Sequence, residues 1–468
     1  MVYHSTTSQA CTSTAAGDAD RLRLVPLAGA AGGRIRVLRI FHAGRNPAHR
    51  ARDRALVAAG VDLIYVVPRF WPEIGSESVL SPEPFPVVEV DVHRPGDVNQ
   101  HSYVDVDSVA NLTVEHGVDV VDLCEEPFSR AAGQLLPRLP AKLPVVMYTA
   151  QNLDKRWPPP FGAYERRSLQ RVQAFYPCSR QAASVLRGKG FGGSIRPLPL
   201  GYDESQYSSG RQSVPGKRYR LALVGRMVPE KGILDAVRVL ADLRRNRGLD
   251  ACLVLAGAGP ALAGGIRLAA ELEVEHDVEA RTWLATEDLA ALYKETEVLL
   301  APSRSTSTWA EQFGRNILEA QASGCVVAGY DSGAMAEVGG KAALLVPEGD
   351  VAGLADVVSS ALGDEAGFEA LRQAGLALAR DRTWRQVAIE QFEMYQAATG
   401  RLPVPLLSGS PRRLRESSVA EYGLPATARG QLRPFAVPIL RRPSPASRAL
   451  GRVMDLVGET SAKLQRRH

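Results

Sequence analysis

Short apolar segments recur through the first half of the sequence and alternate with stretches of helix-favouring composition. Strands are predicted at 36–41, 61–67, 87–90, 118–123 and 144–149, and a helix at 51–59. The helix prediction stops before Gly60, a residue type that commonly follows the last turn of a helix. This alternation indicates βαβ units around a parallel sheet, whose strands are apolar because both faces are buried.

The same alternation begins again after a stretch rich in Ser, Gly and Arg at 208–217. Strands are predicted at 219–225, 251–256, 297–303, 325–328 and 342–346, and a helix at 233–245. We therefore expect an α/β fold with two Rossmann-like domains that face a central cleft. In doubly wound sheets, ligands bind beyond the carboxyl ends of the strands.

The predicted organisation has five parts. They are a disordered N-terminal tail (1–33), a first Rossmann-like domain (34–207), a second Rossmann-like domain (208–382), a helix (383–398) and a basic tail (399–468). Pro, Arg and Ser dominate the last part, which we expect to be mostly disordered apart from a short amphipathic stretch at 449–464.

Composition and charge exclude several classes of protein. Hydrophobic residues make up 45% and charged residues 23%, as in soluble globular proteins and unlike disordered chains, collagen-like fibres or polytopic membrane proteins. The net charge is +5, but from Arg401 onward 13 Lys and Arg face four Asp and Glu, so this stretch carries +9 and the rest −4. The basic tail lacks interleaved aromatic residues, so we expect no nucleic-acid partner and at most a weak peripheral membrane contact.

Cysteine usage indicates the compartment. The five cysteines, Cys11, Cys124, Cys178, Cys252 and Cys325, have no paired spacing, which is typical of a reducing environment rather than of a disulfide framework or a zinc site. No run approaches the 18–20 apolar residues of a membrane span, and the first 33 residues do not resemble a signal peptide. We expect a cytoplasmic protein.

The strongest chemical signal is a pair of carboxylates, Glu311 and Glu319, on either side of Gly314. Gly314 is expected to open a helix, which leaves Glu311 on the preceding loop and Glu319 within the helix. A glycine at a helix start lets a phosphate approach backbone N–H groups, where the helix dipole favours an anion. The alternative is a surface helix with two solvated glutamates.

Three segments of the sequence resemble parts of family 4 glycosyltransferases, which have the GT-B fold. The stretch 299–328 contains the Glu-x7-Glu pair, 225–232 contains an Arg and a Lys five positions apart, and 282–293 matches the segment that flanks the nucleotide base. The resemblance covers residues 34–398. It implies a glycosyltransferase that moves a sugar from a nucleoside diphosphate sugar to an acceptor hydroxyl with retention of configuration. The first domain would bind the acceptor, the second would bind the donor, and the helix after Trp384 would return to the first domain.

The resemblance also implies roles for individual residues of the donor site. Arg226 and Lys231 neutralise the diphosphate in place of a metal, Glu319 accepts hydrogen bonds from the ribose, Glu311 lies near the sugar hydroxyls, Phe313 and Gly314 contribute backbone donors, and Trp283 and Leu284 flank the base. For the two cations, the alternative is ordinary surface charge.

The first domain departs from the pattern of most relatives, which carry a His after the fourth strand. Here Glu125 and Glu126 follow that strand, and a subset of the family shares this Glu-Glu-Pro segment and a Thr-x-Gln-Asn segment matched at 149–152. The resemblance implies that Glu126 or Glu125 orients the acceptor hydroxyl or takes its proton. The alternative is a pair of rim charges fixed by Pro127. Gly44, on the first βα loop, is expected to touch the diphosphate.

No metal site and no resident cofactor are expected. Two literal Asp-x-Asp strings, at 18–20 and 105–107, resemble a metal motif, but neither ends a clear apolar strand. The expected donor is a UDP- or GDP-sugar, and the expected acceptor is a sugar, a lipid-linked molecule or another small molecule. Two other functions remain open, a GT-B phosphorylase or synthase and a non-catalytic nucleotide-sugar-binding protein.

Overall fold

A computed structural model of the chain describes residues 34–72, 82–210, 218–282 and 284–401. By its internal contacts the chain divides into residues 1–406 and 407–468, so both predicted Rossmann-like domains belong to one unit. The predictions for the N-terminal tail, for the amphipathic stretch at 449–464 and for nearly all of the basic tail lie outside the described residues.

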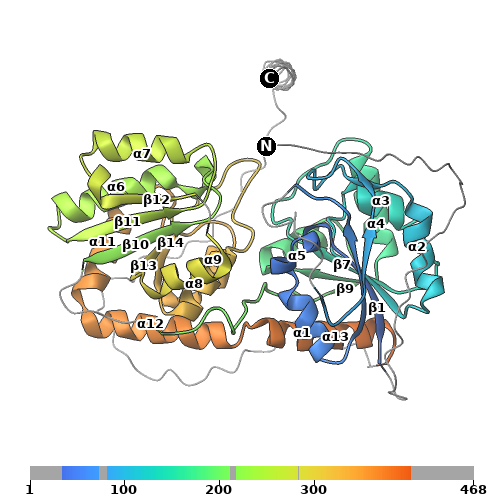
Figure 1. The fold of residues 1–468 in the computed structure, drawn as a ribbon. Coiled ribbons are helices and arrows are strands. Elements are labelled where there is room, and N and C mark those ends of the chain that lie inside the picture. The colour runs from blue at the N-terminus through green and yellow to red at the C-terminus, as the bar shows by residue number, and fades with distance from the viewer. Residues whose placement is uncertain (1–33, 73–81, 211–217, 283, 402–468) are drawn as a thin grey trace, which may run out of the picture. The chain divides into compact units, whose positions relative to one another are not determined.

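The first domain contains a seven-stranded sheet in which all neighbouring strands are parallel (Figure 1). Its strands are β1 Arg36–Ile40, β2 Asp62–Pro68, β3 Val87–Val90, β6 Val120–Leu123, β7 Val145–Thr149, β8 Ala174–Pro177 and β9 Ser194–Ile195. A small hairpin adds β4 Val92–His93 and β5 Ser102–Tyr103. The helices are α1 Ala51–Ala58, α2 Val106–Glu115, α3 Arg130–Leu135, α4 Phe161–Arg171 and α5 Arg180–Gly188, with 3-10 turns η1 His42–Arg45 and η2 Pro47–His49.

The second domain contains a six-stranded parallel sheet. Its strands are β10 Tyr219–Val224, β11 Ala251–Ala256, β12 Val278–Arg281, β13 Val298–Ala301, β14 Val326–Tyr330 and β15 Ala343–Val346. Its helices are α6 Ile233–Arg245, α7 Leu262–Glu271, α8 Thr286–Lys294, α9 Arg315–Ser323, α10 Met335–Gly339, α11 Val351–Gly363 and α12 Glu365–Arg380, with 3-10 turns η3 Pro229–Lys231, η4 Glu275–Asp277 and η5 Gly340–Ala342. The last helix of the described chain is α13 Trp384–Ala398.

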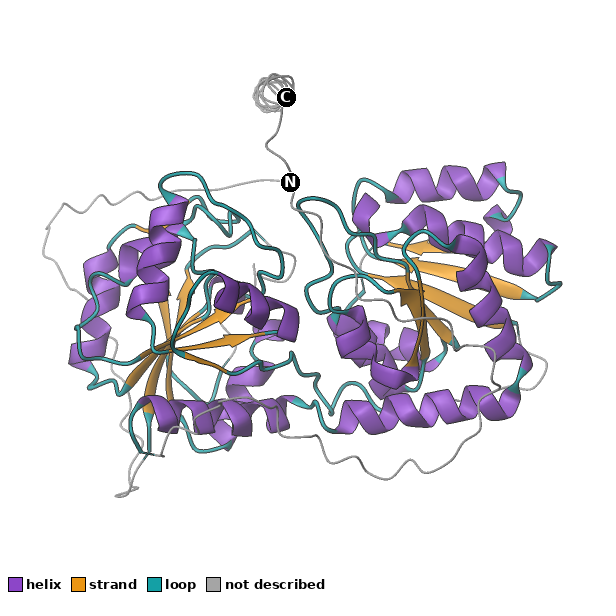
Figure 2. Cartoon of the chain, turned by 180° about the vertical axis from the view of Figure 1, so that it is seen from behind, coloured by secondary structure: helices purple, strands orange, loops and turns teal. Residues whose placement is uncertain are grey.

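Both sheets have helices on their two faces (Figure 2), which confirms the α/β prediction of two Rossmann-like domains. The strand orders are β3-β2-β1-β6-β7-β8-β9 and β12-β11-β10-β13-β14-β15. In each sheet the order reverses beside the first strand, between β1 and β6 and between β10 and β13. A reversal of this kind is where open α/β sheets bind their ligands.

The apolar strand runs predicted the central strands, and the structure adds strands that the pattern did not reveal. The missed strands of the two sheets are β8, β9 and β12. The last of these, Val278–Arg281, is an edge strand with two charged residues among its four, and β9 has only two residues. Short or edge strands bury less apolar surface, so β9 and β12 leave a weak signal in the sequence, whereas β8 is an interior strand of four buried residues.

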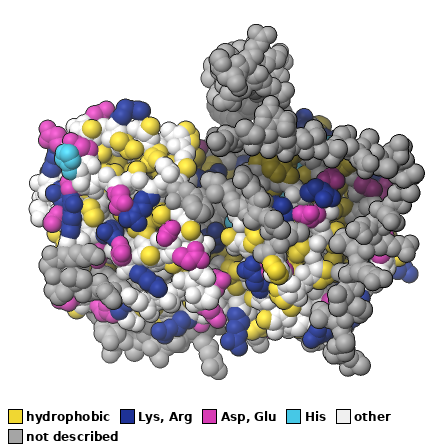
Figure 3. Space-filling model, in the orientation of Figure 1, with side chains coloured by type: hydrophobic (Ala, Val, Ile, Leu, Met, Phe, Trp, Pro, Cys, Tyr) yellow, Lys and Arg dark blue, Asp and Glu magenta, His cyan; other side chains and the backbone are white. Residues whose placement is uncertain are grey.

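Successive side chains of a strand point to opposite sides of the sheet, so a single strand contributes to the apolar clusters on both faces. In β1, Leu38 and Ile40 belong to one apolar cluster, whereas Val37 belongs to the cluster on the other face. In β10, Leu221 and Ala222 divide in the same way. At the surface, basic and acidic side chains are interspersed over the face seen in Figure 3. No helix among the described residues is long and apolar enough to cross a membrane.

Helix α13 packs on α1 of the first domain. Its side chains Ala388, Met394 and Tyr395 are part of the apolar cluster beneath the first sheet. The helix therefore returns from the second domain to the first, as the family resemblance implied.

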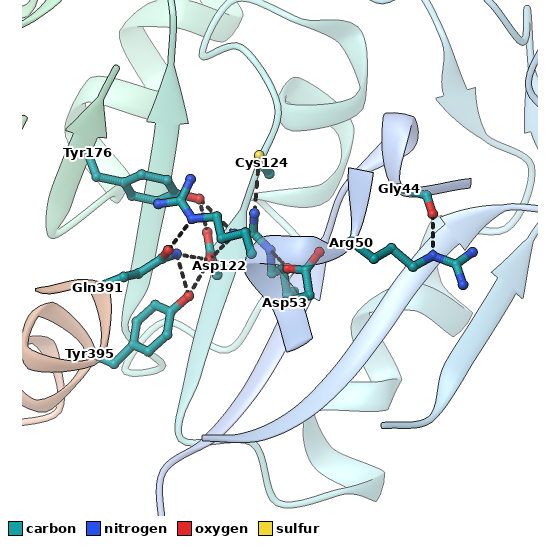
Figure 4. Close-up of polar contacts among 10 residues, drawn as sticks. Gly44, Arg50, Asp53, Asp122, Cys124, Tyr176, Gln391 and Tyr395 are labelled. Atoms are coloured by element: carbon teal, nitrogen blue, oxygen red, sulfur yellow. Dashed lines mark hydrogen bonds and ion pairs between the residues drawn. The ribbon is translucent and has the colours of Figure 1, made fainter. Parts of the chain in front are cut away.

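A buried polar network joins α13 to the centre of the first sheet (Figure 4). Asp122, on β6, is fully buried and pairs with Arg39 of the neighbouring strand β1. The Asp122 carboxylate also accepts hydrogen bonds from the hydroxyls of Tyr176 and Tyr395 and from Gln391 Nε2, the last at 2.7 Å. Because an unpaired buried charge is very unfavourable, these donors hold the helix in one position.

Arg39 has a second ionic partner, Asp53 of α1, at 2.5 Å. Burial, and then the adjacent Asp122 carboxylate, raise the pKa of Tyr395 well above its usual value, so this hydroxyl stays protonated and remains a donor. The network thus connects β1, β6, α1 and α13 through groups that are protected from solvent.

We predict that Tyr395→Phe destabilises the protein. The variant removes a donor to the buried Asp122 carboxylate and the acceptor for Gln391 Nε2, which lies 2.6 Å from the hydroxyl. Loss of such a bond to a charged group costs about 1–3 kcal/mol of the free energy of unfolding. Urea denaturation monitored by circular dichroism measures the change.

Tyr219→Phe is the matched control, because its hydroxyl lies 3.5 Å from the carbonyl oxygen of Leu362, beyond an ordinary hydrogen bond. Its expected cost is below about 0.5 kcal/mol. Equal stability of the two variants would show that the network does not secure α13.

Candidate functional site

The candidate donor site lies where β10 and β13 end at the reversal of the second sheet. The two strands pair in parallel, with Leu221 opposite Val298, so their carboxyl ends emerge side by side. Arg226 follows β10, and Ser303 follows β13. Two loops that carry polar side chains therefore start next to each other.

Lys231 is brought to this edge by a close approach of two backbones. It ends η3 and precedes Gly232, which has a φ of 69°. A Cβ atom at Gly232 would lie 2.0 Å from the carbonyl oxygen of Pro302. Only glycine combines this left-handed conformation with such contact, so the Lys-Gly dipeptide fixes the position of Lys231 beside the loop after β13.

Glu311 lies at the centre of the site, on the loop before α9 as predicted. Its Oε2 lies 2.5 Å from Lys231 Nζ and accepts a hydrogen bond from Ser303 Oγ at 3.0 Å. The ammonium group of Lys231 also lies 5.6 Å from the ring centroid of Trp309. The predicted cation and the predicted carboxylate are thus direct partners.

Helix α9 presents free backbone donors to the same place. It begins after Gly314, which has a φ of 78°, and no side chain caps it. Among the described residues, none accepts a hydrogen bond from the N–H groups of Gly314, Arg315 or Asn316. Such orphan donors, together with the helix dipole, form a binding site for an anion.

A small hollow adjoins these groups. Its polar lining comprises Lys231, Ser303, Glu311 and Asn316, and apolar side chains from β10, β13, α9 and α10 complete it. The side chain of Phe313 is buried beneath the helix start, in the apolar cluster on this face of the sheet. Only the backbone of Phe313 is therefore available to a ligand.

Glu319 lies inside α9, on its buried face. Its carboxylate is 3.0 Å from Arg315 Nε and 3.5 Å from the Tyr293 hydroxyl. Burial raises the pKa of Glu319 above its usual value, although the Arg315 cation acts in the opposite direction. The charge of His49, from η2 of the first domain, also lowers this pKa, so η2 lies within electrostatic reach of Glu319.

The other predicted donor-site residues differ in their surroundings. Arg226 is exposed, and no ion pair or hydrogen bond of its side chain occurs within the described residues, so the cation is available. Leu284 packs against the apolar cluster that contains Tyr293. Trp283 lies outside the described residues.

In the first domain, the residues after β1 and β6 meet at the other sheet reversal. His42 Nδ1 lies 2.9 and 2.8 Å from the two carboxylate oxygens of Glu125, and the backbone N–H of His42 donates to Oε1 at 3.1 Å. His101 Nε2 is 3.6 Å from Glu125 Oε2. The two histidines thus share Glu125 as a partner, which no local pattern of the sequence indicates.

Glu126 points away from Glu125 and towards the loop after β7. Its carboxylate accepts hydrogen bonds from Thr149 Oγ1 at 2.5 Å and from the Ala150 N–H at 2.8 Å. Two residues further on, Asn152 Nδ2 donates to the carbonyl oxygen of Glu311 at 2.9 Å. The Thr-x-Gln-Asn segment therefore links Glu126 to the donor site.

Gly44 lies in η1, where its small size has a packing reason. A Cβ atom there would lie 2.0 Å from the Tyr65 hydroxyl, and its carbonyl oxygen accepts from Arg50 Nε at 2.7 Å. The diphosphate contact predicted for Gly44 remains a prediction.

The Asp-x-Asp string at 105–107 has a structural role. Asp105 caps α2 by accepting from the Ser108 N–H, and Asp107 pairs with Arg138 at 2.9 Å on the surface. One group of potential metal ligands, formed by His42, His101 and Glu125, was found within the described part of the chain, with ligand atoms within 4.8 Å of one another.

Comparison with known proteins identifies the second domain. Residues 208–376 match the family model "Glycosyl transferases group 1". The match lies within the second domain. The predicted resemblance to GT-B glycosyltransferases is thereby confirmed.

Two curated relatives match this chain at moderate identity. The D-inositol 3-phosphate glycosyltransferase of Nocardia farcinica is 32% identical over 223 residues, which is 44% of this chain and 48% of the relative. The GDP-mannose-dependent alpha-(1-6)-phosphatidylinositol monomannoside mannosyltransferase of Mycolicibacterium smegmatis is 30% identical over 205 residues, 41% and 53% of the two chains. The match thus spans about half the length of each relative.

Solved structures share the GT-B fold of this chain over both domains. Sucrose-phosphate synthase from Thermosynechococcus elongatus superposes with a TM-score of 0.61 at 17% identity, covering 79% of this chain and all of the other. Anabaena HepE, solved in complex with UDP and glucose, gives a TM-score of 0.59 at 14% identity over 78% of this chain and all of HepE. At these identities the likeness concerns the fold.

We predict that Glu126→Gln lowers the melting temperature of the protein. Thr149 and Ala150 now donate to the two oxygens of one carboxylate. A glutamine has a single amide oxygen, and its NH2 group cannot accept a hydrogen bond. One buried donor would lose its acceptor, at a cost of about 1–3 kcal/mol. Differential scanning calorimetry measures the shift, with Glu115→Gln at the exposed end of α2 as the control. A melting temperature equal to that of the control would show that Glu126 does not secure the 149–152 loop.

Proposed function

We propose that the protein transfers a sugar from a nucleoside diphosphate sugar to an acceptor hydroxyl, with retention of configuration and without a metal ion. The observation that carries this proposal is the convergence of Lys231, Glu311 and the uncapped start of α9 at the reversal of the second sheet. The family of the second domain supports the same chemistry.

The leaving group explains this arrangement. Cleavage of the bond to the sugar leaves additional negative charge on the diphosphate, and positive groups fixed in advance stabilise it. Lys231 supplies one charge, exposed Arg226 supplies a second, and the free N–H groups after Gly314 supply a dipole. In this proposal the diphosphate replaces Glu311 as the main partner of Lys231, and Glu311 is then free to bind a hydroxyl of the sugar.

Glu319 is proposed to accept hydrogen bonds from the ribose hydroxyls. Its buried carboxylate is adjacent to Tyr293, and Leu284 belongs to the same apolar surface, suited to a nucleoside. Burial raises the pKa of Glu319 and so disfavours its ionised form. Two ribose hydroxyls that donate to the carboxylate would stabilise that form and strengthen nucleotide binding.

On the acceptor side, Glu126 is proposed as a positioning residue rather than a group in contact with the reacting atoms. Its two hydrogen bonds hold the loop whose Asn152 contacts Glu311. The Glu125 carboxylate faces His42 and His101 and is 1% exposed, so we propose that it acts on the acceptor side through these histidines.

The donor and the acceptor are proposed by class. One curated relative is GDP-mannose-dependent and a structural neighbour was solved with UDP, so we propose a UDP- or GDP-sugar as donor. The two relatives are named for inositol phosphate and phosphatidylinositol mannoside acceptors, and we propose a sugar, cyclitol or lipid-linked acceptor. We also propose a cytoplasmic location, which agrees with the four described cysteines being free thiols. The basic tail is proposed to make weak contact with a membrane.

We predict that Arg226→Ala and Lys231→Ala each reduce turnover at least tenfold. Charge-assisted contacts to the leaving diphosphate are typically worth about 1.5–3 kcal/mol, which corresponds to this factor or more. The measurement is release of nucleotide from UDP-glucose and GDP-mannose, accompanied by a melting-temperature screen with UDP, GDP, ADP and TDP. The nucleotide that matches the donor should stabilise the unmodified protein most, because it binds the native state.

Arg267→Ala is the matched control, since Arg267 is exposed on α7 and takes no part in the proposed site. It should retain the turnover and the nucleotide response of the unmodified protein. Nucleotide binding without any release of sugar would favour a non-catalytic binding protein, and unchanged turnover in both site variants would remove the phosphate-site assignment.

We also predict that activity survives excess EDTA. The fixed cations and the start of α9 supply the positive charge that a divalent metal provides in other glycosyltransferases. Nucleotide release should therefore be the same before and after chelation. A complete loss that magnesium or manganese restores would contradict a metal-independent reaction.

A further inference from the structure

His42 and Glu125 form a hydrogen-bonded pair at the reversal of the first sheet. His42 follows β1 and Glu125 follows β6, which are adjacent parallel strands with Ile40 opposite Leu123. Both carboxylate oxygens lie within 2.9 Å of His42 Nδ1, and the His42 backbone N–H adds a third contact. The carboxylate therefore fixes both the ring and the backbone of His42.

This pairing determines which ring nitrogen carries the proton. Burial alone would raise the pKa of Glu125, but His42 and His101 outweigh burial and lower it to about 2. Both carboxylate oxygens face Nδ1 and can only accept hydrogen bonds, so a His42 ring with a single proton carries it on Nδ1. The lone pair of that ring is then on Nε2.

The rings of Trp71 and His101 pack against the His42 ring. The Trp71 ring lies 4.6 Å from the His42 ring and 5.1 Å from the His101 ring, between centroids. His101 is buried, and its Nδ1 lies 3.1 Å from the carbonyl oxygen of Asp97, which turns its Nε2 towards Glu125. Burial lowers the pKa of His101, but Glu125 outweighs it and raises the pKa above its usual value.

Nε2 of His42 is open to solvent. No hydrogen bond to it occurs among the described residues, and it is not one of the buried side-chain atoms without a partner. The His42 side chain is 14% exposed, whereas the Glu125 carboxylate behind it is 1% exposed. A small part of the His42 ring thus reaches solvent, while its Nδ1 is held by the buried Glu125 carboxylate.

The pair is connected to the candidate donor site through short contacts. Glu126, next to Glu125, binds the loop whose Asn152 donates to the Glu311 carbonyl oxygen. On the other side, η2 follows His42 by a few residues, and the charge of its His49 acts on Glu319. One neighbouring segment therefore contacts the loop of Glu311, and the other lies within electrostatic reach of Glu319.

We propose that His42 Nε2 accepts the hydrogen bond of the acceptor hydroxyl in the transfer reaction, and that Glu125 and His101 are positioning residues behind it. This inference rests on the proposed function and adds the group that would contact the acceptor. The hydrogen bond turns a lone pair of the acceptor oxygen towards the anomeric carbon. As that oxygen bonds to the carbon, the bond from the carbon to the diphosphate breaks, the diphosphate leaves with the electron pair, and the acceptor proton passes to His42 Nε2.

A divalent metal bound by His42, His101 and Glu125 is the competing occupant of this place. The geometry favours the hydrogen-bonded pair, because both Glu125 oxygens face the same ring nitrogen and one of them also accepts from a backbone N–H. The metal is one of the outcomes that the experiment tests.

Two substitutions of His42 separate its two nitrogens. In His42→Asn, the amide group can replace Nδ1 opposite Glu125, but nothing replaces Nε2. In His42→Gln, the longer side chain can bring an amide oxygen to the place of Nε2. We expect His42→Asn to lower nucleotide release from the donor on the order of 10²-fold, and His42→Gln to retain several-fold more activity than His42→Asn.

The nucleotide dissociation constant, measured by calorimetry with UDP and GDP, should stay within about twofold in both variants, because His42 contacts the acceptor rather than the donor. His276→Asn is the control, since His276 is 94% exposed on η4 of the second domain. Unchanged turnover in His42→Asn, or a parallel loss of nucleotide affinity, would overturn the proposal.

Two measurements do not depend on turnover. Nitrogen-15 NMR of the histidine rings should show His42 with its proton on Nδ1, and Glu125→Gln should weaken this preference. An Nε2–H ring in the unmodified protein would overturn the inference, and so would one equivalent of zinc per chain by plasma emission spectrometry. If the unmodified protein neither binds nor consumes nucleotide sugars, the proposed function fails, and the NMR result still decides whether Glu125 sets the His42 ring.

Discussion

The arrangement of this protein depends on one topological constraint, the reversal of strand order beside the first strand of each parallel sheet. Neighbouring strands that run in the same direction place their carboxyl ends together, and at a reversal the helices that follow go to opposite faces. The loops after β1 and β6 thereby bring His42 to Glu125. In the second sheet, the loops after β10 and β13 bring Lys231 to Ser303 and Glu311. Both polar clusters have the same geometric origin.

The loop after β7 connects the two clusters. Glu126 accepts two hydrogen bonds from its start, and Asn152 at its end donates to the Glu311 carbonyl oxygen. The two adjacent glutamates after β6 thus have different surroundings. Glu125 faces two histidines that lower its pKa to about 2, whereas burial raises the pKa of Glu126 despite its hydrogen bonds to Thr149 and Ala150. One carboxylate is suited to holding a ring, and the other to holding a loop.

Several buried polar side chains of the first domain stabilise its core rather than form the candidate site. The fully buried Asp122 receives hydrogen bonds from two tyrosines and Gln391 as well as an ion pair with Arg39. These contacts attach α13, the last described helix, to the sheet whose first strand leads to His42. A helix that follows the second domain in sequence is therefore part of the first domain's core.

The sequence by itself determined the two α/β domains, because central parallel strands are buried on both faces and leave apolar runs that recur with helices between them. It also indicated the residues of the candidate donor site, since Glu311, Gly314 and Glu319 lie within one short segment whose spacing is local. Only the tertiary structure decided the partners of Glu125 and Glu126, which come from different loops, and the attachment of α13 through Asp122. These contacts join residues far apart along the chain, and no local pattern encodes which carboxylate of an adjacent pair faces which strand end.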